Sequence, residues 1–145
     1  MIEKKLLQII DANLNRTREG LRVCEDIARF SLENKSVTKS LKTIRHGATG
    51  LVLKSKKISL ARLLSGRDTC RDKAKFIDFR KETGIDISDI FMSNIERVKE
   101  SLRVLEECFK LIDEKISRGY RKLRFNTYDI EKSVVKKTGL ISCNR

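Results

Sequence analysis

The chain has 145 residues, of which 39% are hydrophobic and 37% are charged, which excludes an intrinsically disordered protein and favours one domain over residues 1–145. It contains no apolar run near the ~18 residues of a membrane span and no signal-peptide core, so we expect a cytoplasmic protein. The net charge of +13 predicts an anionic partner, while a single histidine and four cysteines without C-x-x-C spacing argue against a zinc or histidine-rich metal centre.

The first part of the chain predicts a helical hairpin. The sequence has no proline, and its apolar residues recur with the 3.6-residue spacing of amphipathic helices, which predicts an all-α fold. One long helix is expected over about residues 3–33 and a second near residues 37–56.

A connector over about residues 57–86 follows. We expect a short helix near residues 60–64, a turn at Gly66, a further helical stretch and a turn at Gly84. Residues 35–81 hold fourteen lysines and arginines against three aspartates. This basic region favours a nucleic acid or a phosphorylated small molecule as partner, with a lysine-rich solvated surface as the alternative.

The last part of the chain predicts a second hairpin. A helix begins near residue 87, with Asp86 or Ser88 as its N-cap, and another lies near residues 118–137. The simplest architecture is a bundle of four long helices, made of two helical hairpins that pack together.

Both hairpins carry the pattern N-x-x-R-x-x-E-small-L-R-V-x-E, at residues 13–25 and again at residues 94–106. Core packing alone would preserve the leucine and valine positions and let the polar positions drift. Because the polar positions recur as well, we expect a site with pseudo-two-fold symmetry, and recent duplication is the competing explanation. The predicted organisation is repeat 1 (about 3–56), the connector, and repeat 2 (about 87–137).

Two asparagines are predicted to lie within the apolar stripes of their helices. Asn13 and Asn94 each place an amide where burial costs on the order of 1–3 kcal/mol unless its hydrogen bonds are satisfied. They either bond each other or a neighbouring backbone across the bundle, or they face a polar pocket. Arg16 and Arg97, one turn later, favour the pocket, because a half-buried guanidinium requires a carboxylate or a phosphate.

The other repeated polar residues are predicted to lie opposite the apolar stripe, where we favour a surface ladder of ion pairs over a dimer interface or an outer ligand contact: Arg22, Glu25, Arg103 and Glu106. Arg45 and Arg124 occupy matching positions in the second helix of each hairpin. We consider both to be candidate phosphate-binding residues.

The connector contains Arg67, Asp68 and Thr69 directly after Gly66. A carboxylate for Mg²⁺ or a substrate hydroxyl, a guanidinium for phosphate charge and a glycine for close approach are the groups that phosphoryl transfer requires. An Arg–Asp pair that fixes a loop is the alternative. The sequence has no P-loop, no dinucleotide-binding glycine motif and no protein-kinase motif set.

The combination of these motifs resembles a family of thiamin biosynthesis, the ThiD2 type of hydroxymethylpyrimidine phosphate kinase, which is often fused N-terminally to thiamin phosphate synthase. The resemblance runs from about residue 8 to residue 133. It rests on Ile10 to Arg16, Glu19 to Val23, Glu25 to Phe30, Arg67 to Thr69, Asn94, Arg97, Leu102 to Glu107, and Lys110.

This resemblance implies ATP-dependent phosphorylation of 4-amino-5-hydroxymethyl-2-methylpyrimidine phosphate to the diphosphate, with ATP and Mg²⁺ as cofactors. Carried over by the matching motif, Arg67 and Asp68 are candidate catalytic residues, and a role of Asp68 as metal ligand or base is our own hypothesis. Carried over in the same way, the substrate-binding residues are Asn13, Arg16, Asn94 and Arg97. A separate thiamin phosphate synthase and a second copy of the chain are the protein partners that we expect.

The chain departs from the family pattern in the connector, where Asp72, Lys73 and Ala74 stand in place of an Asp-Val-Gly sequence. It also carries no synthase domain, so we expect it to act as a separate chain. Two other functions remain open at this point. One is a non-catalytic binding domain of the thiamin pathway, and the other is a basic helical protein that binds nucleic acid.

Overall fold

The fold is all-α, as predicted. A computed structural model describes residues 2–75 and 85–138, and that part of the chain contains no strand. Its helices are α1 (Lys4–Phe30), α2 (Lys35–Lys54), α3 (Leu60–Gly66), α4 (Ile87–Phe109) and α5 (Glu114–Thr138).

The predicted helices correspond to these elements, with three differences. Gly66 is the last residue of α3 and not a turn that follows it. Helix α5 begins four residues before the expected start, because Asp113 Oδ1 accepts a hydrogen bond from the backbone N–H of Lys115 at 3.1 Å and so caps its first turn. In the connector, residues 70–75 form bends and turns instead of a further helix. The rest of that expected stretch and Gly84 lie outside the described residues.

Helix caps fix where α2 and α4 begin. The Asn34 side chain accepts a hydrogen bond from the backbone N–H of Val37 at 3.0 Å. Asp86 is the N-cap of α4, which confirms one of the two expected caps, and it forms a capping box with Asp89. None of the helices in the described part of the chain is both long and apolar enough to cross a membrane.

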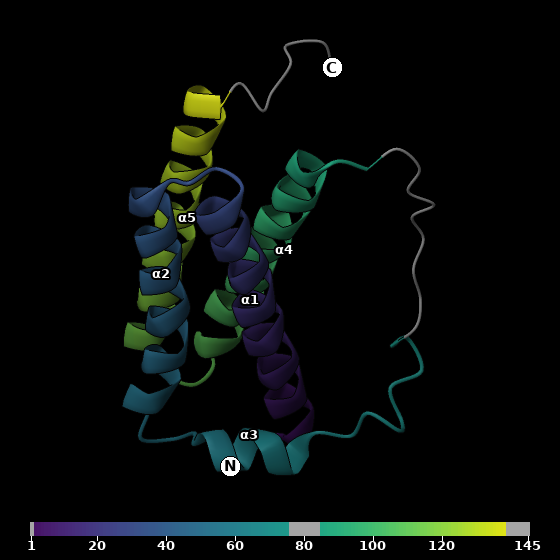
Figure 1. Ribbon diagram of the computed structural model, residues 1–145. Coiled ribbons are helices and arrows are strands. Elements are labelled where there is room, and N and C mark those ends of the chain that lie inside the picture. The colour runs from purple at the N-terminus through teal and green to yellow at the C-terminus, as the bar shows by residue number, and fades with distance from the viewer. Residues whose placement is uncertain (1, 76–84, 139–145) are drawn as a thin grey trace.

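Two antiparallel hairpins, α1–α2 and α4–α5, pack together as a four-helix bundle (Figure 1). Helix α1 contacts both α2 and α4, and α5 completes the bundle by contacting α4 and α2. The short helix α3 lies across the end of the bundle and contacts α1 (Figure 1). The relation of the hairpins by an approximate two-fold axis stays a prediction.

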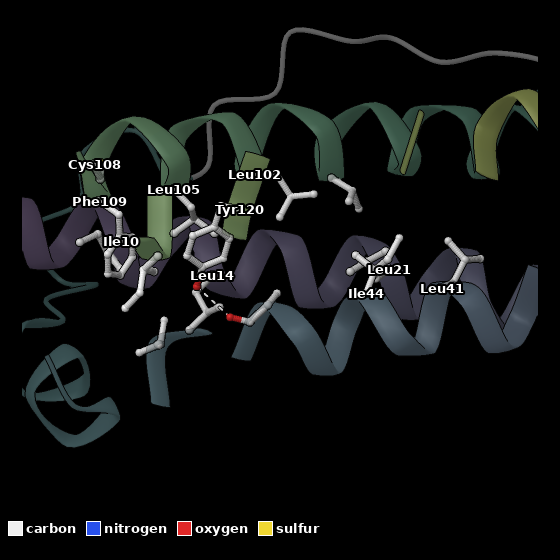
Figure 2. Packing of buried hydrophobic residues seen from close by; sticks show 14 of the residues in the cluster. Ile10, Leu14, Leu21, Leu41, Ile44, Leu102, Leu105, Cys108, Phe109 and Tyr120 are labelled. Carbon is white, nitrogen blue, oxygen red and sulfur yellow. Dashed lines mark hydrogen bonds between the residues drawn. The ribbon is translucent and has the colours of Figure 1, made fainter. Parts of the chain in front are cut away.

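The core is formed by apolar side chains from all four long helices (Figure 2). Tyr120 is its largest fully buried side chain, and its hydroxyl donates a hydrogen bond to the Ala48 carbonyl at 2.8 Å. Burial raises the pKa of Tyr120, so this donor keeps its proton at all ordinary pH values. The bond ties α5 to α2 in the middle of the bundle.

Helices α1 and α4 approach closely where both carry small residues. A Cβ added to Gly20 would lie 2.8 Å from Cγ2 of Val98, so only glycine fits without a shift of the partner helix. Nearby, the hydroxyls of Thr17 and Ser101 share a hydrogen bond of 2.7 Å. This crossing holds the repeated residues of the two helices on either side of one groove.

Candidate functional site

The segment that leaves α3 is tied to α1 by a buried carboxylate. The guanidinium of Arg67 donates from Nε to Asp11 Oδ2 and from Nη2 to Asp11 Oδ1, both at 2.7 Å. Asp11 is 8% exposed, so this two-pronged ion pair is largely shielded on the carboxylate side. The hydrogen bond raises the pKa of Arg67 above its ordinary value. A second tie is the bond from Gln8 Nε2 to the Gly66 carbonyl at 2.8 Å.

Because Asp11 of α1 binds the side chain of Arg67, the neighbouring residue Asp68 is held close to α1. Its Oδ1 accepts a hydrogen bond from the backbone N–H of Arg71 at 3.1 Å, and its Oδ2 lies 3.5 Å from Nε of the same arginine. This segment and the first half of α1 enclose an open cleft of about 660 Å³. Its polar and charged lining comes from Lys4, Lys5, Gln8, Asp11, Asn15, Arg67, Asp68, Thr69, Arg71 and Asp72.

A second hollow, a groove of about 430 Å³, lies between α1 and α4. Apart from Val104, its lining consists of residues at equivalent positions of the two copies of the pattern. These pairs are Asn13 with Asn94, Arg16 with Arg97, Glu19 with Glu100, and Gly20 with Ser101. The repeated polar residues of the first half of the pattern thus share one groove.

Each of the two asparagines uses one of its two amide N–H donors within its own helix. Asn13 Nδ2 donates to the Ile9 carbonyl and Asn94 Nδ2 to the Ile90 carbonyl, both at 2.8 Å. The expected alternative, in which they bond each other or a backbone across the bundle, is wrong. Asn13 Oδ1 lies 3.4 Å from Nη1 of Arg16. Both asparagines line the groove, where a carboxamide offers an acceptor oxygen and one remaining N–H donor.

The predicted site residues fall into two neighbouring hollows. Arg67 and Asp68 line the cleft, and the two asparagines with Arg16 and Arg97 line the groove. Ala12 lines the cleft and Arg16, one helical turn later, lines the groove, so the two hollows are neighbours along α1.

Sequence reasoning missed Asp11, which binds Arg67 at the start of the segment that follows α3. One signal was present, because an aspartate interrupts a run of apolar positions on α1 where the second copy of the repeat has Met92. Its partner Arg67 lies 56 residues away, so no local pattern identified the pair.

The prediction of a surface ion-pair ladder is wrong for the two glutamates. Glu25 is 4% exposed and Glu106 is 2% exposed. Arg45 donates from Nε and Nη2 to Glu25 at 2.5 and 3.1 Å, and this raises the pKa of Arg45. Of the four residues predicted for the ladder, only the two arginines are exposed. Arg22 forms an ion pair with Asp26, and Arg103 forms one with Glu107.

Glu106 has two arginine partners. Arg121 Nε donates to Oε1 at 2.7 Å, and Arg124 donates from Nη2 to Oε2 at 2.8 Å. Burial alone would raise the pKa of Glu106, but the hydrogen bonds and positive charge of the two arginines outweigh it and hold that pKa below its ordinary value. Phosphate binding by Arg45 and Arg124 stays a prediction, and both guanidiniums already hold a buried carboxylate.

The sequence profile of the ThiD2 family matches residues 8–133 of this chain. Three curated relatives are called thiamine-phosphate synthase. The protein of Synechocystis is 34% identical over 90% of this chain and 36% of its own length. That of Prochlorococcus marinus subsp. pastoris is 35% identical over 88% and 34%. That of Rhodopirellula baltica is 33% identical over 86% and 33%.

This chain thus spans about a third of the length of the curated relatives that it matches. No solved structure matches it. The profile covers most of the chain, including the groove, both copies of the repeated pattern and every residue that lines the cleft except Lys4 and Lys5. The chain therefore belongs to the ThiD2 family.

Proposed function

We propose that this protein is a kinase of thiamin biosynthesis that transfers the terminal phosphoryl group of ATP to 4-amino-5-hydroxymethyl-2-methylpyrimidine phosphate. Membership of the ThiD2 family and relatives called thiamine-phosphate synthase support the pathway. The observation that carries the reaction type is the cleft, in which the Asp11–Arg67 pair positions the segment that bears Asp68.

The attacking group is an oxygen of the substrate phosphate. It forms a bond to the γ-phosphorus of ATP while the bond from that phosphorus to the β–γ bridging oxygen breaks, and ADP leaves with the electron pair. A phosphate monoester loses its second proton near pH ~6, so the attacking oxygen is already ionised at neutral pH. No general base is required, and this favours Asp68 as a metal ligand over Asp68 as a base.

Mg²⁺ in kinases binds one or two carboxylates together with phosphate oxygens and water. In the described part of the chain no group of three or more Asp, Glu, His or Cys side chains converges. Asp68 and Asp72 both line the cleft, which fits a metal that arrives with the nucleotide. Bound Mg²⁺ would neutralise charge on the phosphates, and Lys4 and Lys5 in the same cleft would add positive charge.

The groove suits the pyrimidine substrate. The amide oxygens of Asn13 and Asn94 can accept hydrogen bonds from an exocyclic amine, because each amide is oriented by a bond from its nitrogen to a helix carbonyl and its oxygen has two lone pairs. Arg16 and Arg97 are exposed in the groove and can bind a phosphate. Arg16 lies one helical turn from the cleft, so a substrate phosphate bound to Arg16 would lie close to a nucleotide bound in the cleft.

The experiment follows ADP release with Mg-ATP and the pyrimidine phosphate, in the wild type and in Asp68→Asn. We expect substrate-dependent turnover that falls about 100-fold or more in the variant, since the carboxylate charge that holds the metal is lost. Asp129→Asn, on the exposed face of α5, is the matched control and should retain wild-type turnover. Identification of the diphosphate product by mass spectrometry excludes an unspecific ATPase.

Absence of turnover would contradict the kinase. If the pyrimidine phosphate still binds, the protein is a non-catalytic domain of the thiamin pathway. If it does not bind, the thiamin assignment fails, and salt-dependent binding of nucleic acid to this chain of net charge +13 becomes the function to examine.

A separate thiamin phosphate synthase is the protein partner that we propose. In the curated relatives, the segment similar to this chain is about a third of a longer protein called thiamine-phosphate synthase. A self-associated dimer is the other proposed assembly, since Arg22 and Arg103 remain exposed at equivalent positions. Analytical ultracentrifugation of the chain alone and mixed with a synthase distinguishes the two.

A further inference from the structure

Two smaller pockets occupy equivalent positions in the two hairpins. One, of about 310 Å³, is lined by Asn15, Arg18, Glu19, Arg22 and Arg45. The other, of about 360 Å³, is lined by the residues that match these in the second copy, Glu96, Lys99, Glu100, Arg103 and Arg124, and in addition by Tyr128. We call them the first side pocket and the second side pocket.

In the second side pocket, Lys99 and Arg124 already bind acceptor groups of the protein itself. Lys99 Nζ forms ion pairs with Glu96 and with Glu131, the latter at 2.9 Å. Burial lowers the pKa of Lys99, but these two carboxylates outweigh it and raise that pKa above its ordinary value. Arg124 donates from Nε and Nη2 to Glu106 and from Nη1 to the Tyr128 hydroxyl at 3.1 Å.

The first side pocket lacks the acceptor side chains that bind Lys99 and Arg124 in the second side pocket. The positions that match Glu96, Tyr128 and Glu131 are occupied by Asn15, Thr49 and Val52.

The cations of the first side pocket correspondingly have fewer acceptor partners than those of the second. Arg18, the counterpart of Lys99, forms no ion pair or hydrogen bond with the described residues. Arg45 uses Nε and Nη2 on Glu25, and its Nη1 has no partner in the described part of the chain. Among the described residues, Arg22 forms an ion pair only with Asp26, at 3.9 Å.

We propose that the first side pocket binds a phosphate group through Arg18, Arg22 and Arg45, and that the second side pocket does not. Guanidinium groups bind phosphate oxygens through paired N–H donors, and three of them converge here with donors to spare. The inference rests on the proposed function for the source of that phosphate.

The location of the pocket supports this role. Asn15 lines both the first side pocket and the cleft, and Glu19 lines both the pocket and the groove. A phosphate held by Arg18 therefore lies about one helical turn from either hollow. The pocket thus adjoins both the cleft and the groove, in which the proposed function places its two phosphate-bearing substrates.

The test compares Arg18→Gln with Lys99→Gln. Each variant removes one positive charge from the chain, so long-range attraction of anions changes equally in both. Pyrophosphate binding is measured by isothermal titration calorimetry at constant ionic strength. Arg18→Gln should weaken binding about tenfold, and Lys99→Gln should leave the dissociation constant within about twofold of the wild type. Equal weakening in both variants, or none in Arg18→Gln, would overturn the proposal.

A second variant closes the pocket instead of removing a donor. Asn15→Glu supplies the carboxylate that Glu96 supplies in the second side pocket, and it should weaken pyrophosphate binding as Arg18→Gln does. Asn15 is only half-buried on α1, so helix content by circular dichroism should not change. Unchanged affinity in this variant contradicts the proposed site.

Titrations with ADP and with the pyrimidine phosphate identify the source of the phosphate. The ligand whose affinity falls in Arg18→Gln but not in Lys99→Gln is the one whose phosphate occupies the pocket, and a loss for neither ligand overturns the proposal. These measurements do not depend on turnover. A protein that binds phosphate through Arg18 but lacks kinase activity would remove the proposed function and leave the phosphate site intact.

Discussion

The hairpin α1–α2 and the hairpin α4–α5 have the same buried polar framework but differ at the surface around it. Each buries a glutamate of the first helix against an arginine of the second, Glu25 with Arg45 and Glu106 with Arg124. Around these pairs, the second hairpin adds Arg121 and a closed set of ion pairs at Lys99. In the first hairpin Arg18, the counterpart of Lys99, has no ion pair with the described residues, so the comparison contrasts cations that hold the bundle with one that does not.

The connector strengthens this asymmetry. Asp11 binds Arg67 and so fixes the segment that bears Asp68, whereas the position in α4 that matches Asp11 is occupied by Met92. The groove is lined almost equally by both copies, but the cleft is formed with α1 alone. A repeated framework therefore carries a single candidate reactive centre, on the side of the first hairpin.

The largest expected effect comes from breaking the framework itself. Glu106→Gln removes the charge that compensates the buried Arg124 and should lower the free energy of unfolding by about 3 kcal/mol. Glu25→Gln should cost less, because the Glu25 carboxylate has one arginine partner where the Glu106 carboxylate has two. Urea denaturation followed by circular dichroism measures both. A larger loss for Glu25→Gln would show that the number of partners does not set the difference between the hairpins.

An intermediate effect is expected at the crossing of α1 and α4. A Cβ at Gly20 would meet Val98 Cγ2 at 2.8 Å and the Asn94 carbonyl oxygen at 3.2 Å, so Gly20→Ala should destabilise the protein by about 2 kcal/mol by forcing the helices apart. Gly50 lies inside α2 with nothing within 4 Å of an added Cβ. Gly50→Ala is therefore the control and should stabilise the protein by about 0.5–1 kcal/mol through helix propensity.

Thermal unfolding of the two glycine variants gives shifts of opposite sign if this argument holds. Because the backbone change is the same in both, any difference between them reports the contact with α4. A stabilised Gly20→Ala would mean that the two helices separate at little cost.

The fold was predictable because its signals are local. Apolar periodicity identified the long helices, and Asp86 was recognisable as an N-cap. The start of α5 was missed although Asp113 offers the same kind of signal. The signal at Asp113 is local as well, but it was not used when the helix was placed near residues 118–137.

The candidate site was predictable only in part. The repeat identified the residues that line the groove, such as Asn13 and Asn94. A helical projection nevertheless misplaced Glu25, because α1 contacts α2 as well as α4 and its buried face is wider than one apolar stripe. The Asp11–Arg67 pair joins positions 56 residues apart, which periodicity and caps do not describe.

The smallest expected effect is on the pH dependence of stability, and it again concerns the framework of the second hairpin. The pKa of Glu106 is lowered below its ordinary value of 4.5, since Arg121 and Arg124 outweigh the effect of burial. The folded state therefore binds this proton less readily than the unfolded state does. The stabilisation is complete above pH 4.5 and is lost as the pH falls through the lower value of the folded protein. Between pH 6 and pH 3, the wild type should lose more stability than Glu106→Gln does.

A salt-dependent control shows whether that acid limb comes from the buried framework. The pKa of Glu114 is also lowered, by its hydrogen bond and ion pair with Arg118, but both side chains are largely exposed. The contribution of Glu114 should therefore disappear in ~1 M salt, where charges are screened over about 3 Å, whereas that of Glu106 should persist. If Glu106→Gln and Glu114→Gln respond to salt alike, the Glu106 pair behaves as a surface ion pair. The buried framework would then not distinguish the interior of this hairpin from its surface.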